Sequence, residues 1–270
     1  MKFLDSLIDR MYAYEIVPHQ VTPEKYNIPF QEVSIPASDG GTLYGWHIPA
    51  SPNAPTIILL HGWSRNLSRT LPYIQAIHPL GYNLLAFDTR NHGSSSAVER
   101  PTVGTFAQDV VSVVKFLRLQ GNTSSIGALG LSVGGGAVIN AAGWEDQIRS
   151  VITVGAISHP KAVMKFEFHK RHIPSFLASL MFGYMRRQYG LDFDAIAPVN
   201  NIRKSQAEFL LIHGKQDETV PVEQARALFE AGNPEKTHLW VIPEKGHSNC
   251  HTYPQFFDKV REFLEKTLPV

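Results

Sequence analysis

The feature that most constrains the fold is a series of short, uninterrupted apolar runs separated by stretches with helical spacing. Strands buried on both faces of a parallel sheet have continuous apolar sequences, whereas strands with one face in solvent alternate. The apolar runs lie at residues 56–60, 83–87, 125–130, 150–155, 208–214 and 238–243, and the helical patterns lie at residues 68–80, 105–120, 133–144, 222–232 and 254–268. Strands that alternate with helices form βαβ units with right-handed crossovers. The sequence therefore predicts an α/β fold with a doubly wound, mostly parallel sheet.

Two segments depart from this alternation. Residues 31–49 contain two apolar runs on either side of Asp39-Gly40-Gly41, which predicts an antiparallel N-terminal hairpin that brings the sheet to eight strands. Residues 157–200 contain no clear strand but two helical stretches, AVMKFEFHKR and FLASLMFGYMRRQ. We interpret this segment as a small helical lid inserted above the sheet, with ordinary helix packing as the alternative.

Residues 1–30 are predicted to form an amphipathic helix and a connector that precede a single α/β domain at residues 31–270, which contains the insertion. Apolar residues recur at helical spacing from Phe3 to Tyr12, whereas the proline-rich stretch that follows favours irregular chain. We expect the helix to pack on the domain or on a partner subunit, so it could mediate a homodimer. An anchor on a membrane surface is the alternative, which the lack of a basic cluster on that face disfavours.

Composition and charge exclude several classes of function. The formal net charge of +1 gives no reason to expect nucleic acid or an anionic membrane as the main partner. No apolar run reaches the length of about 18 residues that a membrane span needs. The single cysteine, Cys250, cannot form an internal disulfide, and the N-terminus lacks the pattern of a signal peptide. We therefore expect a cytoplasmic protein.

The segment LGLSVGGG, residues 129–136, places four glycines around Ser132. It lies between an apolar run and a helical pattern, and ligands of open α/β sheets bind at the carboxyl ends of strands. The spacing Gly130-x-Ser132-x-Gly134 is that of a nucleophile elbow, a sharp strand-to-helix turn that exposes a serine hydroxyl. A structural glycine-rich turn is the alternative.

A serine nucleophile needs a base and an acid that orients the base, and both must lie at the same edge of the sheet. His247 follows the last apolar run, and Asp217 follows the run before it. The chain order serine, aspartate, histidine is that of α/β-hydrolases. We predict Ser132, Asp217 and His247 as a catalytic triad, with Glu218 as the alternative acid.

A tetrahedral oxyanion also needs hydrogen-bond donors. The backbone amide of Val133 would lie at the start of a helix, where N–H groups have no intrahelical partner. The second donor should come from the loop after residues 56–60, where Gly62 permits a tight turn and the Trp63 amide follows. We therefore predict an oxyanion hole formed by Trp63 and Val133.

Other candidate site residues lie in the insertion. His159, at its start, and Phe182, in its second helical stretch, are candidates for the lining of the substrate pocket, with a structural role as the alternative. His169 and His172 have helical spacing for two metal ligands, but no carboxylate or thiolate stands at a complementary step. We expect neither a metal nor a cofactor.

With these motifs, the chain from about residue 31 to 268 resembles the α/β-hydrolase superfamily. The motifs that carry the resemblance are HGW, DTRNHGSS, GLSVGG, HGKQDETVP and GHS. Within the superfamily the chain is similar to bacterial serine hydrolases of the BEM46-like or serine-aminopeptidase-like type, which are generally treated as esterases. The resemblance implies the α/β-hydrolase fold and the roles already given to the triad and to the oxyanion hole. The chain departs from the family pattern at Asn91, where many relatives have glycine.

The function expected from these features is that of a carboxylesterase-like serine hydrolase, which cleaves a small-molecule ester through an acyl-enzyme without a cofactor. A peptidase or amidase with the same triad is the first alternative. A ligand-binding protein on a hydrolase scaffold that lacks catalysis is the second. Dehalogenase and epoxide hydrolase chemistry would need an aspartate in place of Ser132.

Overall fold

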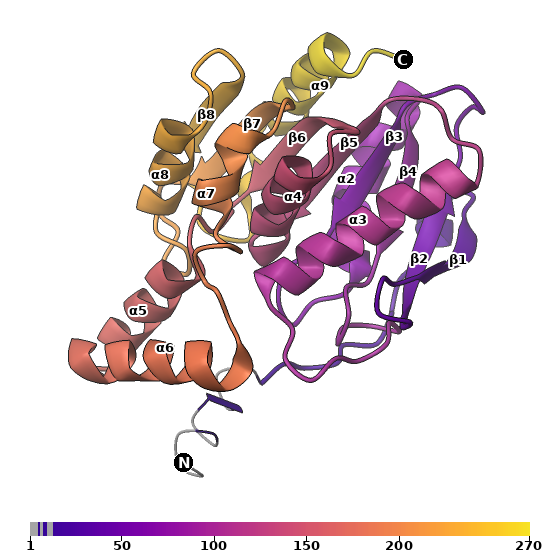
Figure 1. Ribbon diagram of the computed structural model, residues 1–270. Helices are drawn as coiled ribbons and strands as arrows, with labels where there is room; N and C mark the ends of the chain where they lie inside the picture. Colours follow the sequence, from indigo (N-terminus) through magenta and orange to yellow (C-terminus); the bar gives the residue numbers. More distant parts are fainter. Residues whose placement is uncertain (1–4, 6–7, 10–12) are drawn as a thin grey trace.

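A single eight-stranded sheet runs through the molecule, with helices on both of its faces (Figure 1). The structure is a computed structural model that describes residues 5, 8–9 and 13–270. The strand order is β1-β2-β4-β3-β5-β6-β7-β8, and only the pairs β1–β2 and β2–β4 are antiparallel. The strands are β1 (Gln31–Pro36), β2 (Thr42–Ile48), β3 (Thr56–Leu60), β4 (Asn83–Phe87), β5 (Ile126–Leu131), β6 (Ile148–Val154), β7 (Glu208–Gly214) and β8 (Thr237–Ile242).

The helices follow the strands along the chain as the sequence predicts. The α-helices are α2 (Leu71–Ile77), α3 (Val103–Leu119), α4 (Val133–Trp144), α5 (Pro160–Lys170), α6 (Ser175–Tyr189), α7 (Pro198–Asn201), α8 (Glu223–Ala231) and α9 (Phe256–Thr267). Short 3₁₀ helices are η1 (Pro23–Tyr26), η2 (Leu67–Thr70), η3 (His78–Leu80), η4 (Ile202–Lys204) and η5 (Cys250–Thr252).

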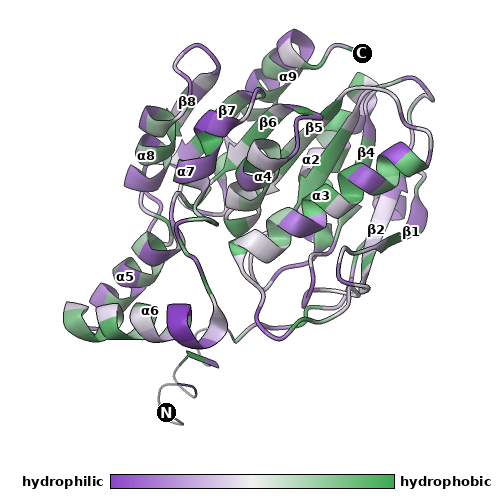
Figure 2. Ribbon diagram, viewed as in Figure 1, coloured by the Kyte–Doolittle hydropathy of each residue, from purple (hydrophilic) through white to green (hydrophobic). Residues whose placement is uncertain are grey.

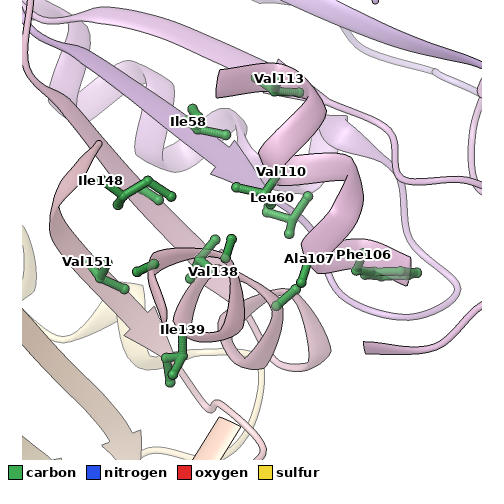
Figure 3. Packing of buried hydrophobic residues seen from close by; sticks show 14 of the residues in the cluster. Ile58, Leu60, Phe106, Ala107, Val110, Val113, Val138, Ile139, Ile148 and Val151 are labelled. Atoms are coloured by element: carbon green, nitrogen blue, oxygen red, sulfur yellow. The ribbon is translucent and has the colours of Figure 1, made fainter. Parts of the chain in front are cut away.

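Apolar side chains of the sheet are buried by helices on each side. On one face, α3 and α4 pack on the sheet. Val110 of α3, Val138 of α4 and Leu60 of β3 belong to one buried apolar cluster (Figure 3). On the other face, α2 and α9 cover the sheet, and Val260 belongs to that second cluster. Truncating such a fully buried aliphatic side chain to alanine typically costs about 2–5 kcal/mol. Two-sided coverage therefore explains the continuous apolar runs.

The hydropathy of the ribbon follows the same layering (Figure 2). The central strands are hydrophobic, while α8 and α9 carry hydrophilic residues on their outer sides. Every residue of β3 and β4 is buried. The predicted α/β-hydrolase fold, with a mostly parallel eight-stranded sheet and an antiparallel N-terminal hairpin, is confirmed.

The segment between β6 and β7 forms the helices α5 and α6, which stand away from the sheet (Figure 1). Their apolar residues pack on one another and on Ile8 of the N-terminal segment in a third cluster. Tyr184 and Tyr189 both donate hydrogen bonds to Asp5, at 2.7 and 2.6 Å. The remaining residues of the predicted N-terminal amphipathic helix lie outside the described residues, and the division at residue 30 stays a prediction.

Candidate active site

Three loops at one edge of the sheet carry the residues predicted as a triad. Ser132 directly follows β5, Asp217 lies three residues beyond the end of β7, and His247 lies in the loop after β8. Strands β5 to β8 are parallel, so their carboxyl ends meet at the same edge. The fold therefore brings together residues that are far apart in the sequence.

Ser132 has a backbone conformation that few residues other than glycine adopt. Its φ is 56° and its ψ is −121°, and it directly precedes α4. A Cβ atom on Gly130 would collide with the carbonyl group of Gly134, and one on Gly134 would collide with the carbonyl oxygen of His61. These close approaches explain both glycines of the elbow. Strain of this kind costs about 1–3 kcal/mol and persists where the surrounding structure enforces it.

A chain of hydrogen bonds links the three side chains. His247 Nε2 lies 2.9 Å from Ser132 Oγ, and His247 Nδ1 lies 2.7 Å from Asp217 Oδ2. Because an ionised carboxylate only accepts, Nδ1 carries the proton and donates to Asp217. The unprotonated Nε2 then faces the serine hydroxyl and can accept its proton.

Asp217 is held as a carboxylate by its own loop. Its Oδ1 accepts hydrogen bonds from the backbone amides of Thr219 and Val220, at 2.9 and 2.8 Å. Burial works against the charged form, but hydrogen bonds from His213, His247 and the Val220 amide outweigh it and hold the pKa of Asp217 well below its usual value. A permanently charged acid fixes the orientation of the imidazole.

His213 is a residue of this site that the sequence analysis missed. It is fully buried at the end of β7, and its Nε2 donates to the Val220 carbonyl at 2.8 Å while lying 3.3 Å from Asp217 Oδ2. Its Nδ1 has no hydrogen-bond partner among the described residues. The available signal was a histidine within an otherwise apolar strand, four residues before the predicted acid.

The loop after β3 lies against Ser132. A Cβ atom on Gly62 would come within 3.1 Å of the Ser132 Cβ, so a larger residue at this position would press on Ser132 and require a small shift there. Trp63 and Ser132 line the same cavity, and Val133 is the first residue of α4. Of the two residues predicted for an oxyanion hole, Val133 is therefore adjacent to Ser132 in the chain and Trp63 lines the same cavity.

Two neutral histidines support this loop. His61 donates from Nδ1 to the Gly62 carbonyl at 2.7 Å, and its Nε2 accepts from the Thr89 amide at 3.2 Å. Burial lowers the pKa of His61 to about 4. His92 Nε2 accepts from the amide of Ser64 at 3.0 Å. Since a protonated imidazole cannot accept, both supports require the neutral form.

Residues 13–21, which we call the N-terminal strap, cross the same loop. The indole of Trp63 donates to the Ala13 carbonyl at 3.3 Å, and the side chain of Asn66 donates to the carbonyls of Val17 and Pro18 at 2.8 and 3.1 Å. His19 Nε2 lies 2.7 Å from Asp88 Oδ2, while Asp88 Oδ1 accepts from the Leu67 amide at 2.8 Å. The connector that the prolines predicted as irregular is thus tied to the site.

Ser132 and His247 line a cavity of about 360 Å³. It is lined by Gly62, Trp63, Arg65, Arg69, Tyr73, Leu131, Ser132, Val154, Thr219, His247, Ser248 and Cys250. The volume is near the lower end of the range for small-molecule sites. Burial raises the pKa of the Cys250 thiol to about 11, so this side chain forms part of the wall as a neutral group.

The structure does not bring the two predicted pocket residues of the insertion to this cavity. His159 is the N-cap of α5, where its Nδ1 accepts from the Lys161 amide and its Nε2 lies 3.0 Å from Asp194 Oδ1. Phe182 is buried in the cluster that α6 forms with Phe168 and Ile8. Phe182 is therefore turned toward the other apolar side chains of the insertion, and His159 is held at the start of α5 by its hydrogen bonds.

Within residues 5, 8–9 and 13–270, no group of three or more histidine, cysteine or acidic side chains is arranged to hold a metal ion. No helix in the same ranges is both long and apolar enough to cross a membrane.

The sequence is similar to a known protein family and to bacterial proteins of similar length. Residues 82–269 match the prolyl oligopeptidase family. The uncharacterized protein YqkD of Bacillus subtilis is 26% identical over 243 residues, which cover 86% of this chain and 78% of that protein. The uncharacterized protein YfhR of Escherichia coli is 27% identical over 226 residues, which cover 80% of this chain and 73% of that protein.

Solved structures share the fold over almost the whole chain. An esterase of Pyrococcus furiosus matches with a TM-score of 0.76 and 24% sequence identity, covering 95% of this chain and 100% of that one. At this level of identity the match shows a common architecture of sheet and helices.

Proposed function

Since this chain belongs to the prolyl oligopeptidase family, within the α/β-hydrolase superfamily, we propose that it is a serine hydrolase that cleaves small carboxylic esters through an acyl-enzyme. The observation that carries the proposal is the hydrogen-bond chain from Ser132 through His247 to Asp217, built on a serine with a φ of 56°. Esterases are among the solved structures that share the fold, which supports the proposal.

In the proposed mechanism, His247 Nε2 takes the Ser132 proton as Oγ attacks the ester carbonyl carbon. The backbone amides of Trp63 and Val133 stabilise the oxyanion that forms. The C–O bond to the alcohol then breaks, and His247 gives the proton to the departing oxygen. Water, deprotonated by His247, attacks the acyl carbon, and the acid leaves while Ser132 regains its proton. Asp217 keeps the imidazole in the required tautomer and stabilises its cation.

The direct test is the hydrolysis of p-nitrophenyl acetate by the purified wild-type protein and by Ser132→Ala. We expect the substitution to lower kcat by about 10³-fold or more, because the nucleophile is removed while the fold is retained. Ser179→Ala is the matched control, since Ser179 is an exposed serine on α6. Turnover by Ser132→Ala at the wild-type rate would reject the proposal.

Amide hydrolysis is a second candidate, and the match to the prolyl oligopeptidase family is the observation that favours it. The same triad can attack an amide, which differs in needing protonation of a more basic leaving group. A comparison of p-nitrophenyl acetate with p-nitroacetanilide separates the two candidates. Faster Ser132-dependent cleavage of the anilide would favour a peptidase or amidase.

A further inference from the structure

The cavity beside Ser132 has an unbalanced charge. Two arginines, Arg65 and Arg69, line it, and no aspartate or glutamate of the described residues does. The Asp217 carboxylate lies behind His247, already engaged by that imidazole at 2.7 Å. A substrate in this cavity therefore meets positive charge on one wall.

Neither guanidinium is neutralised within the part of the chain that the structure describes. Arg65 donates only to the Ser64 carbonyl, at 3.2 Å, and Arg69 only to the Ser248 carbonyl, at 2.6 Å. By contrast, Arg90 is paired with Asp109, and Arg100 is paired with acidic side chains. An arginine has five N–H donors, so most of those on Arg65 and Arg69 remain for a ligand.

The contact with Ser248 fixes the place of Arg69. Ser248 directly follows His247, so the hydrogen bond holds the guanidinium beside the loop that carries the proposed base. Arg65 is exposed and Arg69 is half-buried, which leaves both accessible from the cavity. A planar guanidinium pairs with a carboxylate through two parallel hydrogen bonds.

Tyr73 adds a third donor to the same wall. Its side chain is 2% exposed and lines the cavity, yet its hydroxyl makes no hydrogen bond within the described part of the chain. Burial raises the pKa of Tyr73, and the nearby Arg69 charge opposes that rise, so the phenol is neutral and lies close to the guanidinium. Because Tyr73 lines the cavity, a hydroxyl with no partner among the described residues can donate a hydrogen bond to a ligand there.

We propose that Arg65, Arg69 and Tyr73 form an anion subsite, and that the preferred substrates are short esters with a free carboxylate a few bonds from the scissile carbonyl. This inference rests on the proposed esterase function. The volume of about 360 Å³ fits a small half-ester of a dicarboxylic acid. The carboxylate would also supply the acceptor that Tyr73 lacks.

The first experiment compares monomethyl glutarate with dimethyl glutarate, which lacks the charge, by measuring the release of methanol with proton NMR. We expect the wild-type kcat/KM to be at least about tenfold higher for the monoester, corrected for the two equivalent ester groups of the diester. Arg65→Gln and Arg69→Gln should each lower this ratio about tenfold, whereas Arg69→Lys should retain part of it. Arg226→Gln, an exposed arginine of α8, is the matched control and should leave the ratio unchanged.

The ratio of the two substrates separates recognition from structural damage. Because Arg69 also bonds the Ser248 carbonyl, a substitution that only loosened the His247 loop would slow both esters equally. An unchanged ratio in both arginine variants, or equal wild-type rates for the two esters, would overturn the anion subsite while leaving the esterase proposal intact.

A binding measurement tests the subsite without catalysis. Monomethyl glutarate titrated into Ser132→Ala by calorimetry should bind at least about tenfold more tightly than into the same variant that also carries Arg65→Gln and Arg69→Gln. Binding that depends on the arginines, together with no Ser132-dependent hydrolysis of either ester by the wild-type protein, would support the subsite and reject the esterase. Equal or absent binding in the two variants would reject the subsite.

Discussion

The two sides of Ser132 are built in different ways. On one side, Asp217 is held by amides two and three residues further along its own loop. On the other side, the loop at residues 61–68 depends on distant segments: His92 lies 28 residues from Ser64, and the strap residue Val17 lies 49 residues from Asn66. We call the first the local side, because its contacts lie within one loop, and the second the tertiary side, because its contacts join segments far apart in the sequence. They should therefore respond differently to substitution and to pH.

The largest effect is expected on the local side. Asp217→Asn should lower kcat by about 10³- to 10⁴-fold, because an amide can hold the imidazole in the wrong tautomer and cannot stabilise its cation. KM should change little, since Asp217 does not reach the cavity wall. The measurement is steady-state hydrolysis of p-nitrophenyl acetate. Glu218→Gln is the matched control, and a comparable loss there instead would move the acid to that neighbour.

As the pH falls, the tertiary side should lose its contribution to the free energy of unfolding before the local side does. Burial lowers the pKa of His61 to about 4, against smaller opposing effects of Asp88 and the Gly62 carbonyl. The unfolded chain therefore binds more protons than the folded protein between about pH 6.5 and pH 4. The contribution of His61 is fully present above this window, and about 3 kcal/mol is lost as the pH falls through it. The depressed pKa of Asp217 costs stability only below about pH 4.

Urea unfolding of the wild-type protein and of His61→Gln at pH 7 and pH 4.5 measures this difference. His47, His92 and His251 also have lowered pKa values because of burial, so the wild-type slope contains their contributions too. The difference between wild type and variant isolates His61. His78→Gln serves as the control, and identical pH dependence in wild type and His61→Gln would contradict this assignment.

His92 is expected to act as a positioning residue on the tertiary side. His92→Phe preserves the ring among Trp63, Phe106 and Tyr14 but leaves the Ser64 amide without its acceptor. We expect a loss of about 1–3 kcal/mol in the free energy of unfolding, and a lower kcat with little change in KM. His92→Gln, which can accept a hydrogen bond, should recover part of kcat. Full activity and stability in His92→Phe would show that the loop does not need this support.

The smallest effect is expected at the strap. His19→Phe keeps the stacking on Tyr44, whose ring centroid lies 5.0 Å away, and removes the hydrogen bond to Asp88. The free energy of unfolding should fall by about 1 kcal/mol, because Asp88 still accepts from the Leu67 and Ser94 amides. Thermal unfolding measures this change. A loss as large as that of His92→Phe would mean that the strap, rather than His92, holds the loop.

The same contrast explains what the sequence could predict. Ser132, Asp217 and His247 each follow a recognisable apolar strand within a short motif, so their meeting at one edge follows from parallel strand order. The supports at His92, His19 and Arg69 depend on contacts between residues that are 28, 69 and 179 positions apart, for which a single sequence holds no local signal. His159 and Phe182 lie away from the cavity for the same reason, since the packing of α5 and α6 places Phe182 and the contact with Asp194, 35 residues away, helps to place His159.

The central claim is that Ser132 is the nucleophile, and covalent labelling tests it most directly. The wild-type protein is treated with a fluorophosphonate and mapped by peptide mass spectrometry. The account predicts one stoichiometric adduct on Ser132, and strongly slowed labelling in His247→Ala. An active enzyme that carries no adduct on Ser132, or carries it on another residue, would contradict the account.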